Sequence, residues 1–136
     1  MNTFERLLKA DTAKPDQMQK KVIKSKRLAF VIGEEEPVDI TIRALNTREI
    51  QYVQDFLSDK NGKVIPQRYL DANFIICTKG IVNPDISNQQ LISHFGVKDS
   101  KALVEKLFQA EAANIATEIM TLSGAGEDVN AEIKNS

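Results

Sequence analysis

Few side chains in this sequence are of the types that catalyse reactions or bind metals. His94 is the only histidine and Cys77 the only cysteine among 136 residues. A metal site built on two histidines is therefore excluded, and a conventional Cys–His or Ser–His site would have to use His94. His94 stands beside Phe95 at an expected helix end, where a cationic imidazole favours the terminal carbonyl groups. We therefore interpret His94 as a structural residue.

The other chemically capable groups also have structural interpretations. Cys77 follows Ile75 and Ile76, which favours a small buried thiol, and one cysteine cannot form an internal disulfide. The three consecutive glutamates at positions 34–36 lie in an expected turn, where water solvates them, and no second acidic cluster suggests paired acid–base catalysis. The Gly-Ala-Gly run at 124–126 follows a helix, so it is a helix end and not a phosphate-binding loop. The sequence predicts no enzyme, metal or cofactor.

The charge balance and hydrophobic pattern limit the classes of partner. Lysine and arginine total 18, aspartate and glutamate total 19, and the net charge of -1 gives no field that attracts a polyanion. The basic stretch from Lys20 to Arg27 is interpreted as a solvated tether and strand edge, so nucleic acid is not an expected partner. No apolar run approaches the roughly 20 residues that cross a bilayer, and the first residues lack the apolar core of a signal peptide. We expect a cytoplasmic protein without a membrane partner.

The elements that position these residues begin with a short helix and two strands. Phe4, Leu7 and Leu8 have helical spacing behind Thr3, a candidate N-cap, and a polar linker follows. Apolar residues then alternate along residues 28–32 and again along 38–42, on either side of a turn at 33–37. This alternation predicts two antiparallel strands with one apolar face that helices must cover.

The rest of the chain has helical patterns. Helices are expected from Asn46 or Thr47 to about residue 57, from Pro66 to Gly80, after a capping box formed by Ser87 and Gln90, and from Asp99 or Ser100 to Leu122. The predicted fold is α+β, with an N-terminal antiparallel β-hairpin or small sheet packed against a mostly helical C-terminal bundle. We expect a short helix and linker over 1–20, a single α+β domain over 21–126 and a flexible tail over 127–136.

Glu111 is unusual because it lies within or beside an apolar stripe of the last helical pattern, three residues after Phe108 and four before Ile115. A charge in that position needs a partner. Glu111 either caps a helix that restarts near residues 109–111, or it marks a contact with a partner protein.

The order of several short motifs resembles a known family. The motifs are Ser25-Lys26-Arg27, Val38-Asp39-Ile40-Thr41-Ile42-Arg43-Ala44-Leu45 with Glu49 following, Val82-Asn83-Pro84-Asp85-Ile86, Phe95-Gly96-Val97, Lys106-Leu107-Phe108-Gln109-Ala110-Glu111, Leu122-Ser123-Gly124 and Glu132-Ile133-Lys134-Asn135. Together they resemble the XkdN-like tail assembly chaperones of phages, over nearly the whole chain. One departure is Ala110, where the family usually has glycine, so an uninterrupted helix from Ser100 to Leu122 is an alternative to a broken one.

The resemblance implies a non-catalytic protein that binds the tape measure protein of a phage or prophage tail and keeps it soluble during assembly. It also implies a longer product made by ribosomal frameshifting, which would recruit tail tube protein, and Lys134-Asn135 is compatible with an A-rich slippery site. Self-association is a further open alternative. A rival function is a protein–protein adaptor or regulator unrelated to virion assembly, which the genomic neighbours would distinguish.

A chaperone for a long amphipathic helix needs an apolar surface that binds weakly at each copy and repeatedly along the client. The best candidate in the sequence is the last helical region, although such a stripe also suits a core. The predicted partner-binding residues are Leu107, Phe108, Glu111, Ile115, Ile119 and Leu122.

Overall fold

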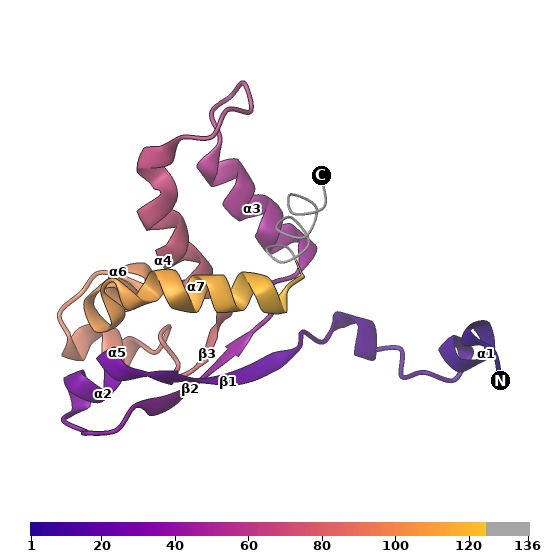
Figure 1. Cartoon of the computed structure of the whole chain (residues 1–136), viewed down its shortest axis with the longest axis horizontal. Helices are drawn as coiled ribbons and strands as arrows, with labels where there is room; N and C mark the ends of the chain where they lie inside the picture. The colour runs from indigo at the N-terminus through magenta and orange to yellow at the C-terminus, as the bar shows by residue number, and fades with distance from the viewer. Residues whose placement is uncertain (125–136) are drawn as a thin grey trace.

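The computed structural model describes residues 1–124 and shows an α+β fold (Figure 1). Its elements, in chain order, are α1 (Thr3–Leu8), η1 (Lys14–Asp16), β1 (Lys20–Ser25), α2 (Lys26–Ile32), β2 (Val38–Arg43), α3 (Thr47–Leu57), η2 (Pro66–Arg68), α4 (Tyr69–Gly80), β3 (Ile81–Asn83), α5 (Gln89–His94), α6 (Ser100–Phe108) and α7 (Glu111–Leu122). The predicted fold class, a small antiparallel sheet against a mostly helical remainder, is confirmed. The expected tail at 127–136 lies outside the described residues.

The sheet has three antiparallel strands in the order β1-β2-β3. Strand β1 pairs with β2 from Lys20 opposite Arg43 to Ser25 opposite Val38, and β3 pairs with the other side of β2. Ile40 and Ile42 of the central strand are fully buried, as the alternation along 38–42 predicts. Helix α7 packs against β1, β2 and α4, so the core lies between the sheet and the helices.

The predicted first strand is wrong in position. Residues 26–32 form helix α2, and the strand that pairs with β2 is the preceding basic stretch. The reason is local: Ser25 Oγ accepts a hydrogen bond from the amide of Leu28 and caps the helix, and Gly33 ends it with a left-handed φ of 84°. Leu28 and Val31 pack on the core at helical spacing, while Phe30 points to solvent.

The predicted helices form with small changes at their starts. Asn46 and Glu49 make a reciprocal capping box at the start of α3. Asn88, and not Ser87, caps α5 by accepting from the amides of Gln90 and Leu91. Asp99 caps α6. The cap of α1 is Asn2 and not Thr3, since the side chain of Asn2 accepts from the amide of Glu5.

The last helical pattern is broken between α6 and α7, as the family resemblance implies and despite Ala110. The break is made by Gln109, whose φ of 51° lies in the region that favours glycine. Because the chain turns there, α7 packs across α4 and does not continue along α6. An uninterrupted helix from Ser100 to Leu122 is therefore excluded.

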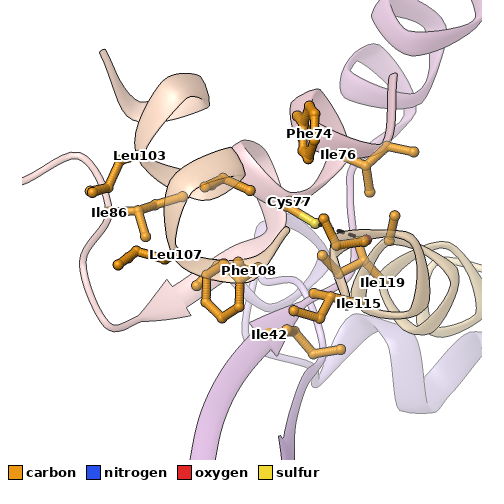
Figure 2. Packing of buried hydrophobic residues seen from close by; sticks show 14 of the residues in the cluster. Ile42, Phe74, Ile76, Cys77, Ile86, Leu103, Leu107, Phe108, Ile115 and Ile119 are labelled. Carbon is orange, nitrogen blue, oxygen red and sulfur yellow. Dashed lines mark hydrogen bonds between the residues drawn. The ribbon is translucent and has the colours of Figure 1, made fainter. Parts of the chain in front are cut away.

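Helices α4 and α7 approach closely at one glycine. A Cβ added to Gly80 would lie 2.5 Å from Cδ1 of Ile119, which is fully buried. The glycine lets the two backbones come near enough for Ile119 to pack in the same core cluster as Cys77 and Phe74 (Figure 2).

Residues 1–19 form an arm that extends away from the body of the molecule (Figure 1). At its base, the carbonyl oxygen of Gln19 accepts a hydrogen bond from the amide of Ala44. Helix α1 lies at the far end, and the apolar side chains of Phe4, Leu7 and Leu8 are 69%, 68% and 73% exposed.

Candidate functional site

Four of the six predicted partner-binding residues belong to the core. Leu107, Phe108, Ile115 and Ile119 each have at most 4% of their surface exposed. Figure 2 shows Phe108, Ile115 and Ile119 directed into the same cluster as Ile42. A client could reach these side chains only if α6 and α7 moved away from the rest of the core. Their assignment as a binding surface stays a prediction.

The other two predicted residues, Glu111 and Leu122, are half-buried. Leu122 packs against the edge of the core at the end of α7. Beyond it, Ser123 Oγ accepts a hydrogen bond of 2.8 Å from the amide of Leu45 and thereby joins the helix end to the segment after β2. Gly124 follows with a left-handed φ of 79°, as expected for a helix end.

Glu111 caps a helix, but not the one that starts with it. Its carboxylate lies at the N-terminus of α2, where Oε2 accepts from the amides of Lys26 at 3.0 Å and Arg27 at 3.1 Å. Its Oε1 accepts from the hydroxyl of Ser25, which is fully buried and itself accepts from the amide of Leu28. Two residues from distant parts of the chain thus satisfy three free amides of one short helix.

A half-buried ion pair lies at the other end of the sheet. The Arg43 guanidinium donates to both carboxylate oxygens of Glu49, at 2.8 and 2.7 Å, and to the carbonyl oxygen of Ala44. The hydrogen bond from Arg43 holds the pKa of Glu49 below its usual value, and the same bond raises the pKa of Arg43. Because Glu49 also accepts from the amide of Asn46, this pair fixes the start of α3 against β2.

The two side chains of catalytic type, Cys77 and His94, have different surroundings in the structure. The Cys77 thiol is buried and donates to the carbonyl oxygen of Ala112 at 3.3 Å, and burial raises its pKa to about 12. His94 is exposed in the last turn of α5, with its ring edge-on to Phe95. Among residues 1–124, no three histidine, cysteine or acidic side chains gather as a metal site would require.

The basic stretch that forms β1 is partly neutralised by acidic residues of the same molecule. Lys21 pairs with Glu118 of α7 at 2.9 Å, and Lys24 pairs with Asp39 of β2. These contacts are exposed and contribute little to stability. They lower the net positive charge that the edge of the sheet presents to solvent.

The described surface carries three groups of exposed apolar side chains. The arm patch consists of Phe4, Leu7 and Leu8, and the α2 patch consists of Phe30 and Ile32. The hairpin patch belongs to the end of the α3–α4 hairpin that projects from the body in Figure 1, and it consists of Val64, Tyr69 and Leu70. Such side chains are candidates for protein contacts because water disfavours them.

Sequence reasoning missed the α2 and hairpin patches for identifiable reasons. Phe30 was assigned to the buried face of a strand, and Leu70 to the apolar face of its helix, whereas they are 72% and 61% exposed. The sequence carries no signal of this exposure, because both residues fit the apolar spacing of their segments.

The comparisons with known proteins identify the family. The model of the phage XkdN-like tail assembly chaperone family matches residues 4–135, which is almost the entire chain. This protein therefore belongs to the XkdN-like phage tail assembly chaperones. No curated protein matches the sequence.

A solved structure has the same fold. The crystal structure of the protein YqbN aligns with a TM-score of 0.55 and 17% sequence identity, covering 85% of this chain and 96% of that one. At this identity the likeness concerns the fold alone. Within the described part of the chain, the helices are too short or too polar to cross a bilayer.

Proposed function

We propose that this protein binds the tape measure protein of a phage tail and keeps it soluble in the host cytoplasm until the tail tube assembles around it. The observation that carries the proposal is the family match over residues 4–135, because it assigns a chaperone of tail assembly to the whole chain. The exposed apolar groups on a chain with an ordinary charged surface support it, since holding an aggregation-prone client requires such groups.

The hairpin patch is the surface that we assign to the client. Val64, Tyr69 and Leu70 are 53%, 51% and 61% exposed, so a client helix can contact them without unfolding the core. Phe56 lies at the same end and is covered by the guanidinium of Arg68, whose Nη1 also bonds the carbonyl oxygen of Phe56. This contact holds the end of the hairpin in a fixed shape, which lowers the entropic cost of binding.

Each copy offers only a small apolar area, so a single contact is weak. A long tape measure protein presents many helical segments, and many weak contacts along one chain give a stable coat that can still be removed stepwise. Release as the tail tube forms then needs no chemical reaction. This agrees with a family whose assigned role is chaperoning and not catalysis.

Co-expression with the tape measure protein tests the proposal. The wild-type chain should carry that protein into the soluble fraction and co-purify with several copies per client. Leu70→Asp should reduce the recovered complex at least about tenfold, because a desolvated carboxylate would replace an apolar contact. Gln54→Asp, an equal charge change at an exposed position of α3, is the matched control and should behave as wild type.

An insoluble tape measure protein in the presence of the folded wild-type chain would refute the function. Normal capture by the folded Leu70→Asp variant would refute only the assignment of the hairpin patch.

The proposed longer product is tested separately. Lys134 and Asn135 lie outside the described residues, so the test is to read their codons in the gene. The absence of a slippery heptamer or of an overlapping frame would remove it.

A further inference from the structure

The hinge between α6 and α7 is short and strained. Only Gln109 and Ala110 separate the last residue of α6 from the first residue of α7. The backbone of Gln109 has φ 51° and ψ -133°, a combination that residues with a Cβ avoid and that costs free energy wherever the surrounding structure imposes it. A short hinge under strain favours a rearrangement that straightens it.

The residues around this hinge favour a continuous helix. From Lys106 to Ala113 the chain contains neither glycine nor proline, and alanine, the residue of highest helix propensity, occupies positions 110, 112 and 113. The break is therefore imposed by the contacts that α7 makes with the rest of the molecule and not by the local sequence. Once α7 leaves those contacts, the local preference is one helix over residues 100–122.

The contacts that anchor α7 join it to earlier parts of the chain. The carboxylate of Glu111 binds the start of α2, and Glu118 pairs with Lys21 of β1 at 2.9 Å. The carbonyl oxygen of Ala112 accepts from the Cys77 thiol at 3.3 Å. The side of α7 that packs on α4 and the sheet contains the buried residues Ala112, Ile115, Ala116 and Ile119. These contacts do not depend on α7 belonging to the same chain, so α7 of a second copy fits the same surface.

We propose that two copies of this chain exchange α7, with the hinge of each copy straightened and residues 100–122 forming one helix. Each α7 then occupies the place on the other copy that the other α7 has left, and its Glu111 caps α2 of that copy. The exchange is reciprocal, so the dimer is closed by a two-fold axis and neither copy keeps an empty α7 site. The broken helix described above belongs to the single copy.

The single copy should predominate in dilute solution. Both forms bury the same side of α7, so their free energies differ mainly by the two relieved hinges and by the independent motion that two copies lose when they join. Raising the protein concentration offsets that loss and favours the dimer. Because α7 must leave the core before it is exchanged, folded copies should convert slowly, and refolding from urea is the practical route to both forms.

Refolding at high protein concentration tests the role of the hinge. The full chain, refolded from urea and separated by size-exclusion chromatography with light scattering, should give a monomer and a dimer. Gln109→Gly relieves the strain of the closed hinge and weakens the straight helix, so the dimer yield should fall at least about tenfold. Gln109→Ala, the matched control, keeps the Cβ and should yield at least as much dimer as wild type. Equal dimer yields from the glycine variant and wild type would overturn the proposal.

Isotope mixing identifies the segment that is exchanged. Ordinary and heavy-isotope-labelled chains are refolded together, and the dimer is treated with a carbodiimide, which joins an amine to a carboxylate that is already paired with it. The Lys21–Glu118 pair is exposed and joins β1 to α7, so the exchanged dimer should give cross-linked peptides with one ordinary and one labelled half. The Lys101–Asp71 pair joins α6 to α4, which both precede the hinge, so its cross-linked peptides should stay unmixed. The monomer fraction, in which both links are unmixed, shows that the reagent reaches the two pairs.

Two further results would overturn the inference. One is a chain that refolds only to monomer up to its solubility limit. The other is a dimer whose Lys21–Glu118 links are unmixed, because such a dimer would form through an outer surface with each α7 in its own chain. Neither experiment involves a client, so failure of the proposed function would leave this inference standing.

Discussion

The carboxylate of Glu111 accepts a hydrogen bond from the hydroxyl of Ser25, a residue 86 positions earlier in the chain. Ser25 is the last residue of β1 and the cap of α2, while Glu111 is the first residue of α7. One contact therefore joins a strand end and two helix starts. The same carboxylate also accepts two amides of α2, so its loss leaves several donors unsatisfied.

Replacing Glu111 by glutamine should destabilise the fold. The amide nitrogen of glutamine cannot accept from the α2 amides, and the favourable charge at the helix start is lost. We expect a loss of about 1–3 kcal/mol in the free energy of unfolding, measured by urea denaturation. Glu105→Gln on the exposed side of α6 is the control and should change it by less than about 0.5 kcal/mol. Equal effects of the two substitutions would contradict the capping role.

The Arg43–Glu49 pair should make stability depend on acid pH. The pKa of Glu49 is lower in the folded protein than in the unfolded chain, so the unfolded state binds more protons as the pH falls. The contribution is complete at pH values above 4.5, the ordinary pKa of a glutamate, and is lost as the pH falls through the lower pKa of the folded state. Glu49→Gln should therefore lose less stability than wild type between neutral pH and the acid range. Identical acid slopes in thermal melts would disprove this.

Adding a methyl group at Gly80 should disturb the packing of α4 on α7. The new Cβ would meet Ile119 at 2.5 Å, so Gly80→Ala should cost about 1–3 kcal/mol despite the better helix propensity of alanine. The Ile119→Ala background removes the clashing atoms. There, Gly80→Ala should cost less, which a double-mutant cycle measures as a coupling energy. Additive effects would show that the two residues do not interact.

Gln109 should be a site where glycine stabilises the protein. A side chain at φ 51° is strained, and strain of this kind costs about 1–3 kcal/mol. Gln109→Gly relieves it and should raise the midpoint of urea unfolding, while Gln109→Ala keeps the Cβ and should give no such gain. A glycine variant less stable than the alanine variant would contradict the assigned backbone conformation.

The general architecture was predictable because it depends on local patterns. The buried alternation of Ile40 and Ile42, the cap at Asn46 and the helix ends all follow from neighbouring residues. Alternation predicted the first strand wrongly, because Leu28, Phe30 and Ile32 have strand spacing and yet lie in helix α2, where Phe30 and Ile32 are exposed. The choice of helix is supported by Glu111, which the sequence places 85 and 84 residues away from the two backbone amides that donate to it.

The partner surface was harder to predict than the fold. A stripe such as Phe108, Ile115 and Ile119 has the same spacing whether it forms a core or binds a client, and burial alone separates the two. The exposed residues Phe30 and Leu70 lie within patterns that also contain core residues. Only the packing of α4 and α2 on their neighbours decides which apolar side chains remain uncovered.

The extended arm also determines how a free copy would be degraded. Lys9 and Lys14 are exposed on a segment that lies outside the sheet and helices, so trypsin-like cleavage would remove α1 first and leave the remaining fold intact. A clipped copy would lose the exposed side chains of Phe4, Leu7 and Leu8 and keep the hairpin patch. Proteolysis would thus remove one exposed apolar surface without unfolding the molecule.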